Sequence, residues 1–295
     1  MGAILIVAAA SLFLYRYYFC TFCEKLIDGR DCGTDTPRMP IAQTKGPELI
    51  KRLNAMRYGS HDEFSLRAIQ RDAERLKFVN AYEAYMILGV VACLRGDQEA
   101  MHEAHQKAIK RVPHDPIAYI NYATSLMNTG QITGAIDQAK QACAVAPHDP
   151  DALNNLVALL KNIGRYREAF ALLNDLRKVS PEQCESLSTV IVEGKQLLET
   201  FGISDDERQE VAQWAAMILQ RNNASVAIPR TTFLLNEGGD KPGIATVFHV
   251  VDASPETVVD MNEQFAESII EANNPAVKEH ILVRFTGAPH AHTTQ

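Results

Sequence analysis

A 34-residue period in the middle of the chain limits the possible fold more than any other feature of the sequence. Gly96, Gly130 and Gly164 lie 34 residues apart. The same spacing separates three prolines: Pro113, Pro147 and Pro181. A fixed period of this length is typical of repeat architectures, in which each repeat is one small unit that stacks on its neighbours. We therefore expect three stacked units of the same fold between residues 82 and 183.

Each unit reads as two amphipathic helices joined at a glycine. In the third unit, Leu153, Leu156, Val157 and Leu160 follow the i, i+3, i+4, i+7 spacing of a helix with one buried face. The glycine ends the first helix, because a helix C-terminus favours the left-handed conformation that glycine adopts at low cost. The proline closes the unit, since it cannot continue a helix interior. The sequence thus predicts three helical hairpins.

These features resemble the tetratricopeptide repeat (TPR) family, whose units have a 34-residue period, a glycine turn, an alanine in the second helix and a terminal proline. Four positions depart from the family pattern without breaking a hairpin: Tyr85, Met101, Tyr119 and Val157. The resemblance implies an α-solenoid in which the first helix of each unit lines a concave groove. It also implies that this groove binds a peptide or protein.

The expected groove changes from apolar to amide-rich along the chain. The candidate peptide-binding residues are Met86, Val90, Ile120, Asn121, Thr124, Asn128, Asn154, Asn155, Lys161 and Asn162. Asn121 and Asn155 lie 34 residues apart, and an asparagine amide can both donate to and accept from a peptide backbone. The pattern resembles the asparagine ladder in the repeat domain of the O-linked N-acetylglucosamine transferases. The alternative is a solvated or helix-capping role for these asparagines.

A carboxylate clamp of the kind that co-chaperone TPR proteins use is not expected. That clamp needs several lysine and arginine side chains on the groove, and Lys161 is the only one on this stripe. An adaptor for the acidic tails of chaperones is therefore disfavoured.

The segments on both sides of the repeats read as further helices and a small mixed domain. Residues 45–81 predict capping helices or a degenerate repeat, and Ser204 with Glu207 predicts a capping box at the start of a helix. Beyond residue 223, strand patterns surround a helix that begins at Ser254 and Pro255. The order predicts a ββαβ module, with a split ferredoxin-like unit as one candidate. The predicted fold class is mostly α: a TPR-type α-solenoid followed by a small C-terminal α+β module.

Residues 1–22 form a candidate transmembrane anchor. Arg16 is their only charged residue, and as a helix they would span about 33 Å, close to the hydrocarbon core of a bilayer. No basic residue precedes the apolar run, which argues against a cleavable signal peptide. The basic residues that follow it place the repeats in the cytoplasm. The alternative is a soluble cytoplasmic protein, in which this stretch is a core helix or lies upstream of the true start.

Composition and motif spacing argue against several classes of function. A net charge of −7 with no run of Lys or Arg argues against a nucleic-acid partner. The three cysteines of residues 20–32 are too few for a structural zinc site. His249, Asp252, Glu256 and His280 form no known catalytic or metal-binding spacing. We therefore expect no cofactor, no metal and no enzymatic activity.

The sequence as a whole predicts an interaction scaffold or adaptor that holds a peptide or protein segment and is anchored to a membrane. One alternative is an enzyme with a catalytic C-terminal module whose repeats recruit substrate. Another is a structural subunit whose groove is filled by its own flanking segment. The expected boundaries are 1–22 for the anchor, 23–44 for a linker, 45–81 for capping helices, 82–115, 116–149 and 150–183 for the repeats, 184–223 for further capping helices, 224–286 for the α+β module and 287–295 for a disordered tail.

Overall fold

The structure of the protein is a computed structural model that describes residues 46–55, 62–222, 224–234, 242–251 and 253–287. The expected anchor at 1–22 and linker at 23–44 lie outside these residues, as does the expected tail apart from Gly287. Among the helices in the described ranges, none is long and apolar enough to cross a membrane.

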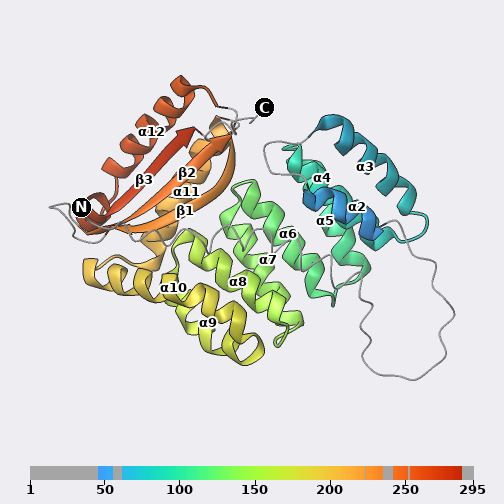
Figure 1. Ribbon diagram of the computed structural model, residues 1–295, viewed down its shortest axis with the longest axis horizontal. Coiled ribbons are helices and arrows are strands. Elements are labelled where there is room, and N and C mark those ends of the chain that lie inside the picture. Colours follow the sequence, from blue (N-terminus) through green and yellow to red (C-terminus); the bar gives the residue numbers. More distant parts are fainter. Residues whose placement is uncertain (1–45, 56–61, 223, 235–241, 252, 288–295) are drawn as a thin grey trace, which may run out of the picture.

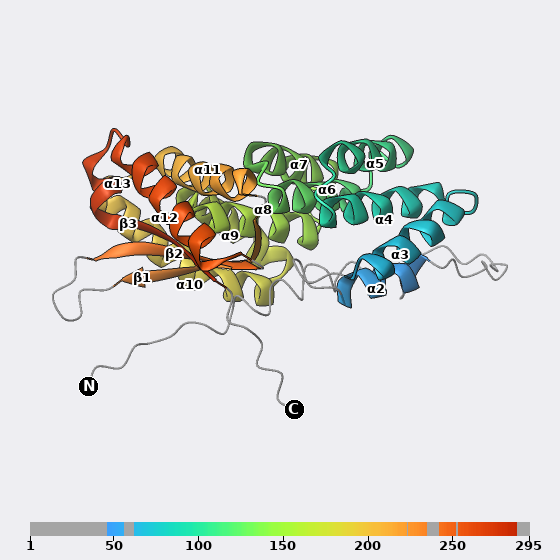
Figure 2. The ribbon, with the colours of Figure 1, turned by 90° about the horizontal axis from the view of Figure 1, so that it is seen from above.

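The described chain is mostly helical, and its helices follow one another in a row (Figure 1). The helices before the first strand are α2 (Gly46–Ala55), α3 (Glu63–Leu76), α4 (Ala81–Leu94), α5 (Gln98–Arg111), α6 (Pro116–Asn128), α7 (Ile132–Val145), α8 (Pro150–Ile163), α9 (Tyr166–Val179), α10 (Pro181–Phe201) and α11 (Asp205–Arg221). Helix α4 pairs with α5, α6 with α7, and α8 with α9. The first helices of these pairs also contact each other, α4 with α6 and α6 with α8. Figure 2 shows α2 and α3 at one end of the row and the sheet at the other.

The turns inside the pairs have the backbone conformation that the glycine spacing predicts. The φ angles of Gly96, Gly130 and Gly164 are +73°, +75° and +82°, in the left-handed region. Between the pairs, Asp115 and Asp149 cap the next helix: their carboxylates accept from backbone N–H groups in its first turn, at 2.9 Å and at 2.9 to 3.0 Å. A proline follows each of these aspartates at the first helical position, where its missing N–H costs nothing. Local chemistry therefore fixes where these helices begin and end.

A fully buried histidine links the first two helix pairs. The ring of His105 stacks on Tyr122 with centroids 5.1 Å apart, and its Nε2 lies 2.9 Å from the hydroxyl of Ser125. The ring fits because it packs against Gly89, where an added Cβ would lie 2.6 Å from Nε2. Burial lowers the pKa of His105 to about 3, since the surrounding protein disfavours the charged imidazolium.

The C-terminal module contains a three-stranded sheet. Its elements are β1 (Ser225–Leu234), β2 (Gly243–Val251), α12 (Pro255–Ile270), α13 (Pro275–His280) and β3 (Ile281–Gly287). The strand order is β1-β2-β3, with β1 and β2 antiparallel and β2 and β3 parallel. The order ββαβ is therefore present, with α13 as an additional short helix. The split ferredoxin-like candidate is wrong, because the two parallel strands are direct neighbours and no third strand lies between them.

Helix α12 covers one face of the sheet. Ile281, Val283 and Phe285 alternate with exposed residues along β3, and they belong to the same apolar cluster as Met261 and Phe265 of α12. Asn262 holds the edge of β3: its amide oxygen accepts from the Phe285 N–H, and its nitrogen donates to the Phe285 carbonyl, both at 2.9 Å.

A buried arginine connects the helices to the sheet. Arg208 of α11 is 2% exposed, and its Nη2 donates to the hydroxyl of Thr246 on β2 at 2.8 Å. Its side chain lies against Gly164, where an added Cβ would overlap Arg208 Cγ. The predicted capping box is confirmed at the start of the same helix, where the Glu207 N–H donates to Ser204 Oγ and the Ser204 N–H donates to the Glu207 carboxylate. The turn after α8, helix α11 and strand β2 thus meet at one point.

Candidate functional site

Helices α4, α6 and α8 carry all the residues that the sequence assigns to a peptide-binding groove. The structure divides these residues by exposure: Met86, Asn154 and Asn155 are buried, Val90, Ile120, Asn121, Thr124, Asn128 and Lys161 are half-buried, and Asn162 is exposed. The accessible part of this surface therefore lies at Val90 of α4, on α6 and on the C-terminal end of α8. We call the surface formed by these ten residues the first-helix face.

Neighbouring helices meet on this face through Asn121. Its amide nitrogen donates to the sulfur of Met86 at 3.6 Å, which is a weak hydrogen bond. On the same helix, the hydroxyl of Thr124 donates to the carbonyl oxygen of Ile120 at 2.9 Å. The structure thus brings Met86 and Asn121 together, while the Thr124 hydroxyl is used within α6.

Asn155 has different surroundings from Asn121, although the two residues are 34 positions apart. Asn155 is 3% exposed, and its amide oxygen accepts no hydrogen bond from the residues that the structure describes. The contact that Asn121 makes is not repeated at Asn155, because the position equivalent to Met86 is Ile120, which has no polar side-chain atom. A buried acceptor without a partner costs about 1–3 kcal/mol. Asn155 is therefore a polar group that gains from any donor brought to it.

Lys161 lies two turns further along α8 and has an unusual environment for a lysine. It is half-buried and forms no ion pair with a residue in the described ranges. Desolvation lowers the pKa of its amine to about 8. A ligand oxygen, whether a carbonyl or a carboxylate, would replace part of the water that this ammonium has lost.

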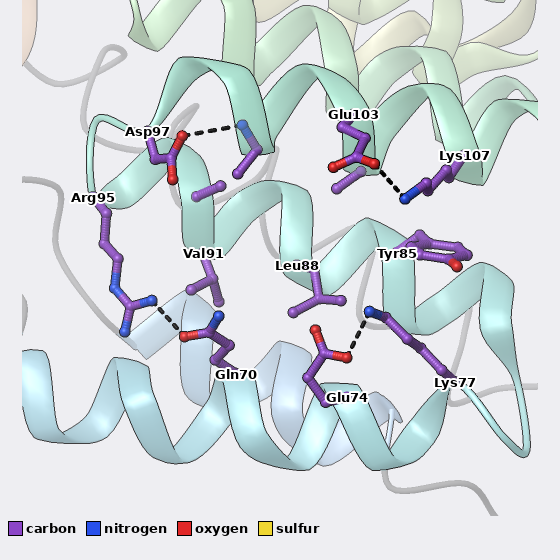
Figure 3. A pocket seen from close by; sticks show the side chains of 13 residues that line it. Gln70, Glu74, Lys77, Tyr85, Leu88, Val91, Arg95, Asp97, Glu103 and Lys107 are labelled. Carbon is purple, nitrogen blue, oxygen red and sulfur yellow. Dashed lines mark hydrogen bonds and ion pairs between the residues drawn. The ribbon is translucent and has the colours of Figure 1, made fainter.

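The structure also contains a pocket that the sequence interpretation missed, between α3, α4 and α5 (Figure 3). Its volume is about 150 Å³, and its lining combines apolar and charged side chains. The apolar residues of the lining are Leu88, Val91, Ala92, Ala100 and Ala104. The sequence shows the small alanines of α5. It does not show the position of α3, which leaves the space above them open.

Charged side chains surround this pocket at both ends. Near Tyr85, the Lys77 and Lys107 amines lie 5.3 and 5.6 Å from the ring centroid, and the Arg111 guanidinium lies 6.0 Å from it. Lys77 pairs with Glu74 at 2.6 Å, and Lys107 pairs with Glu103 at 2.5 Å. At the other end, Arg95 pairs with Glu63 at 3.0 Å and donates to Gln70.

The histidines of the C-terminal module have local structural contacts. His280 stacks on Phe201 with centroids 3.9 Å apart, and its Nδ1 lies 2.8 Å from the carbonyl oxygen of Pro242. His249 Nδ1 lies 2.9 Å from the hydroxyl of Thr286. Glu256 is exposed in the first turn of α12, and Asp252 lies outside the described residues. The structure therefore gives His249, His280 and Glu256 separate surroundings.

No family model matches this sequence, and no curated protein matches it. Within the described part of the chain, no group of three or more His, Cys, Asp or Glu residues is placed to hold a metal ion. The geometry of the described helices therefore carries the functional proposals.

Proposed function

We propose that the protein is a non-catalytic interaction scaffold whose α4–α5, α6–α7 and α8–α9 pairs form a TPR-type solenoid. In this proposal, the first-helix face binds an extended segment of another protein. The 34-residue period, the positive φ angles at the three glycine turns and the contacts between α4, α6 and α8 support the solenoid.

The observation that carries the binding proposal is the buried, unpaired amide oxygen of Asn155. More than nine in ten buried polar groups in native structures have a partner, so an exception asks for an explanation. A peptide N–H can pair with this oxygen when the Asn155 side chain turns out of its buried position, and the pairing then removes the penalty of the unpaired oxygen. Asn121, at the equivalent position of α6, presents a half-buried amide to the same peptide.

Lys161 gives the face a charge preference at its α8 end. Its ammonium is desolvated and has no acidic partner in the described chain, so a peptide carbonyl or an acidic side chain is favoured there. Attachment to a membrane through residues 1–22 is part of the proposal. The contacts of His249 and His280 give no reason to prefer the alternative of a catalytic C-terminal module.

A peptide selection on the full-length protein tests the proposal. Random 12-residue peptides displayed on phage are selected on the protein, and the best peptide is titrated by calorimetry. We expect Asn121→Ala with Asn155→Ala to weaken binding about tenfold or more, through the loss of two amide contacts. Lys161→Met should weaken the binding of acidic peptides in particular.

The matched control replaces two exposed asparagines away from the face, Asn174→Ala with Asn273→Ala, and should leave affinity unchanged. Thermal unfolding followed by circular dichroism verifies that each variant is folded. Equal affinity of the Asn121 and Asn155 variant and of the control would refute the proposed contacts. Failure to select any peptide that saturates the protein would refute the scaffold function of this face.

A further inference from the structure

The side of helix α12 that faces away from the sheet carries apolar side chains exposed to solvent. Val259 and Ile270 are 56% and 68% exposed, and Ala266 is exposed between them. At 3.6 residues per turn, these three residues lie within about 40° of one another around the helix. Met261 and Phe265, which belong to the apolar cluster of the sheet, lie on roughly the opposite side. We call Val259, Ala266 and Ile270 the apolar stripe of α12, and Figure 1 shows this helix on the outer side of the C-terminal module.

A row of carboxylates runs beside the apolar stripe. Its members are Asp260, Glu263, Glu267 and Glu271, all exposed, and we call them the acidic row. By the same helical geometry they occupy an arc of about 80° next to the stripe. None of them forms an ion pair with a Lys or Arg of the described ranges. The sequence also has no Lys or Arg between positions 241 and 278. The outward side of α12 is thus apolar along one line and negatively charged along the next.

The charge of this surface decides which occupant fits it. A second copy of the chain that docked with the same face would bring an identical acidic row, and like charges placed opposite each other are unfavourable. The phosphates of a membrane surface or of a nucleic acid are negatively charged as well. Lysine and arginine side chains, in contrast, are attracted to the row.

The length of the surface favours a helical partner. The stripe and the row extend together from Val259 to Glu271, about 18 Å along more than three turns. In paired helices, apolar residues form the line of contact and the charged residues beside it pair with the opposite helix. A helix laid along α12 can therefore cover the apolar stripe and reach the acidic row at the same time.

We propose that the outward side of α12 is a docking surface for a basic amphipathic helix of a partner protein. The apolar residues of that helix pack on Val259, Ala266 and Ile270, and its lysine and arginine side chains pair with the acidic row. Exposed apolar surface that is bordered by charged residues is typical of contact surfaces between proteins. The surface shares no residue with the first-helix face, so it adds a second interaction to the proposed peptide binding.

Fluorescence anisotropy with labelled synthetic peptides tests the surface on the full-length protein. The first probe is about 18 residues long, five helical turns, with leucine at every third or fourth position and lysine or arginine elsewhere. The second probe has the same composition in a scrambled order that forms no apolar face. The third replaces lysine and arginine by glutamate. We expect saturable binding of the first probe, at least about tenfold weaker binding of the other two, and weaker binding of the first as salt is raised.

One pair of variants tests the apolar stripe. Val259→Ser with Ile270→Ser should reduce affinity for the first probe about tenfold or more, because two side chains no longer bury apolar surface against it. The matched control, Phe64→Ser with Val79→Ser, changes residues that are 81% and 74% exposed at the other end of the molecule. This control should stay within about twofold of the unchanged protein. Melting temperatures confirm that both variants are folded.

A second pair tests the acidic row. Glu263→Lys with Glu267→Lys should weaken binding about tenfold and make it less sensitive to salt, because two attractions become repulsions. The matched control is Glu185→Lys with Glu193→Lys, which makes the same charge change at exposed positions of α10. A general attraction of the probe to an acidic protein would weaken equally in both variants.

Four outcomes would overturn this docking surface. They are no saturable binding of the first probe, equal binding of the scrambled probe, equal losses in a variant and its matched control, or a dimer in light scattering that the Val259→Ser and Ile270→Ser variant dissociates. The last result would mean that a second copy covers the stripe. If the probe is lost in the Asn121→Ala and Asn155→Ala variant, it occupies the first-helix face. The α12 surface is then refuted, while the scaffold function of that face stands.

Discussion

Replacing Gly164 by alanine is expected to lower the stability of the protein where the helices contact the C-terminal sheet. Two independent costs arise at this position. The first is conformational, because Gly164 has a φ angle of +82° and the left-handed region costs a residue with a Cβ about 1–2 kcal/mol. The second is steric, because the new methyl group would overlap Arg208 Cγ and lie 2.8 Å from its Nε.

The steric cost is large because Arg208 cannot move away freely. It is 2% exposed, and its Nη2 is held by the hydroxyl of Thr246. Extra atoms in a well-packed interior cost about 1–3 kcal/mol. The total for Gly164→Ala is therefore about 2–5 kcal/mol. Gly96→Ala is the matched control: its φ angle is +73°, but nothing lies within 4 Å of the added Cβ, so only the conformational cost of about 1–2 kcal/mol applies.

Thermal unfolding followed by tryptophan fluorescence measures the difference in stability between the two variants where the helices contact the sheet. Trp214 is the only tryptophan of the chain, and it packs against the apolar cluster shared by α11 and the sheet. At about 2–4 °C per kcal/mol, Gly164→Ala should lower the midpoint clearly more than Gly96→Ala. Equal midpoints for the two variants would refute the steric part of the reasoning. They would mean that Arg208 is free to shift.

The remaining predictions concern the interior of the helix pairs. Gly89→Ala should destabilise the protein by about 1–3 kcal/mol, because its Cβ would lie 2.6 to 2.8 Å from three ring atoms of His105. Gly134→Ala should stabilise the protein by about 0.5–1 kcal/mol, because the nearest atom to the added Cβ belongs to Leu126, at 3.5 Å. Urea unfolding measures both variants, and the reverse order of stability would contradict this packing. The folded-state pKa of His105 is about 3 against an ordinary 6.5, so the unfolded state binds the proton more readily as pH falls below 6.5. The free energy of unfolding should fall by about 1.4 kcal/mol per pH unit through this window, and His105→Gln, measured by urea titration at pH 7, 6 and 5, should show a shallower slope.

The helix boundaries could be predicted because they depend on local chemistry. A glycine in the left-handed conformation, an aspartate whose carboxylate accepts from the next turn and a proline at the first helical position each act within a few residues. The capping box of Ser204 and Glu207 is local in the same sense. Sequence spacing is sufficient for such features, since no distant part of the chain takes part in them.

The surroundings of the candidate site residues could not be predicted in the same way. Asn121 and Asn155 have equivalent positions, yet one donates to Met86 and the other is buried without a partner for its oxygen. The burial of Lys161, which lowers its pKa to about 8, also does not follow from its spacing along α8. The pocket beside Tyr85 required the position of α3 relative to α5, and a periodic pattern within one helix carries no information about it.

Helix α8 links the proposed binding face to the C-terminal module. It carries Asn155 and Lys161, and it ends at Gly164, which lies against the buried Arg208. Arg208 has no carboxylate partner in the described chain, and its Nε is buried without a hydrogen bond. Burying a guanidinium with a single hydroxyl acceptor costs stability, so we do not attribute to it a stabilising role. Arg208 does fix the position of α8 relative to α11 and β2. This contact holds the end of α8 that carries Lys161. Arg208 is therefore one of the contacts through which a change in the sheet at Thr246 can reach α8, beside the apolar cluster that α11 shares with the sheet.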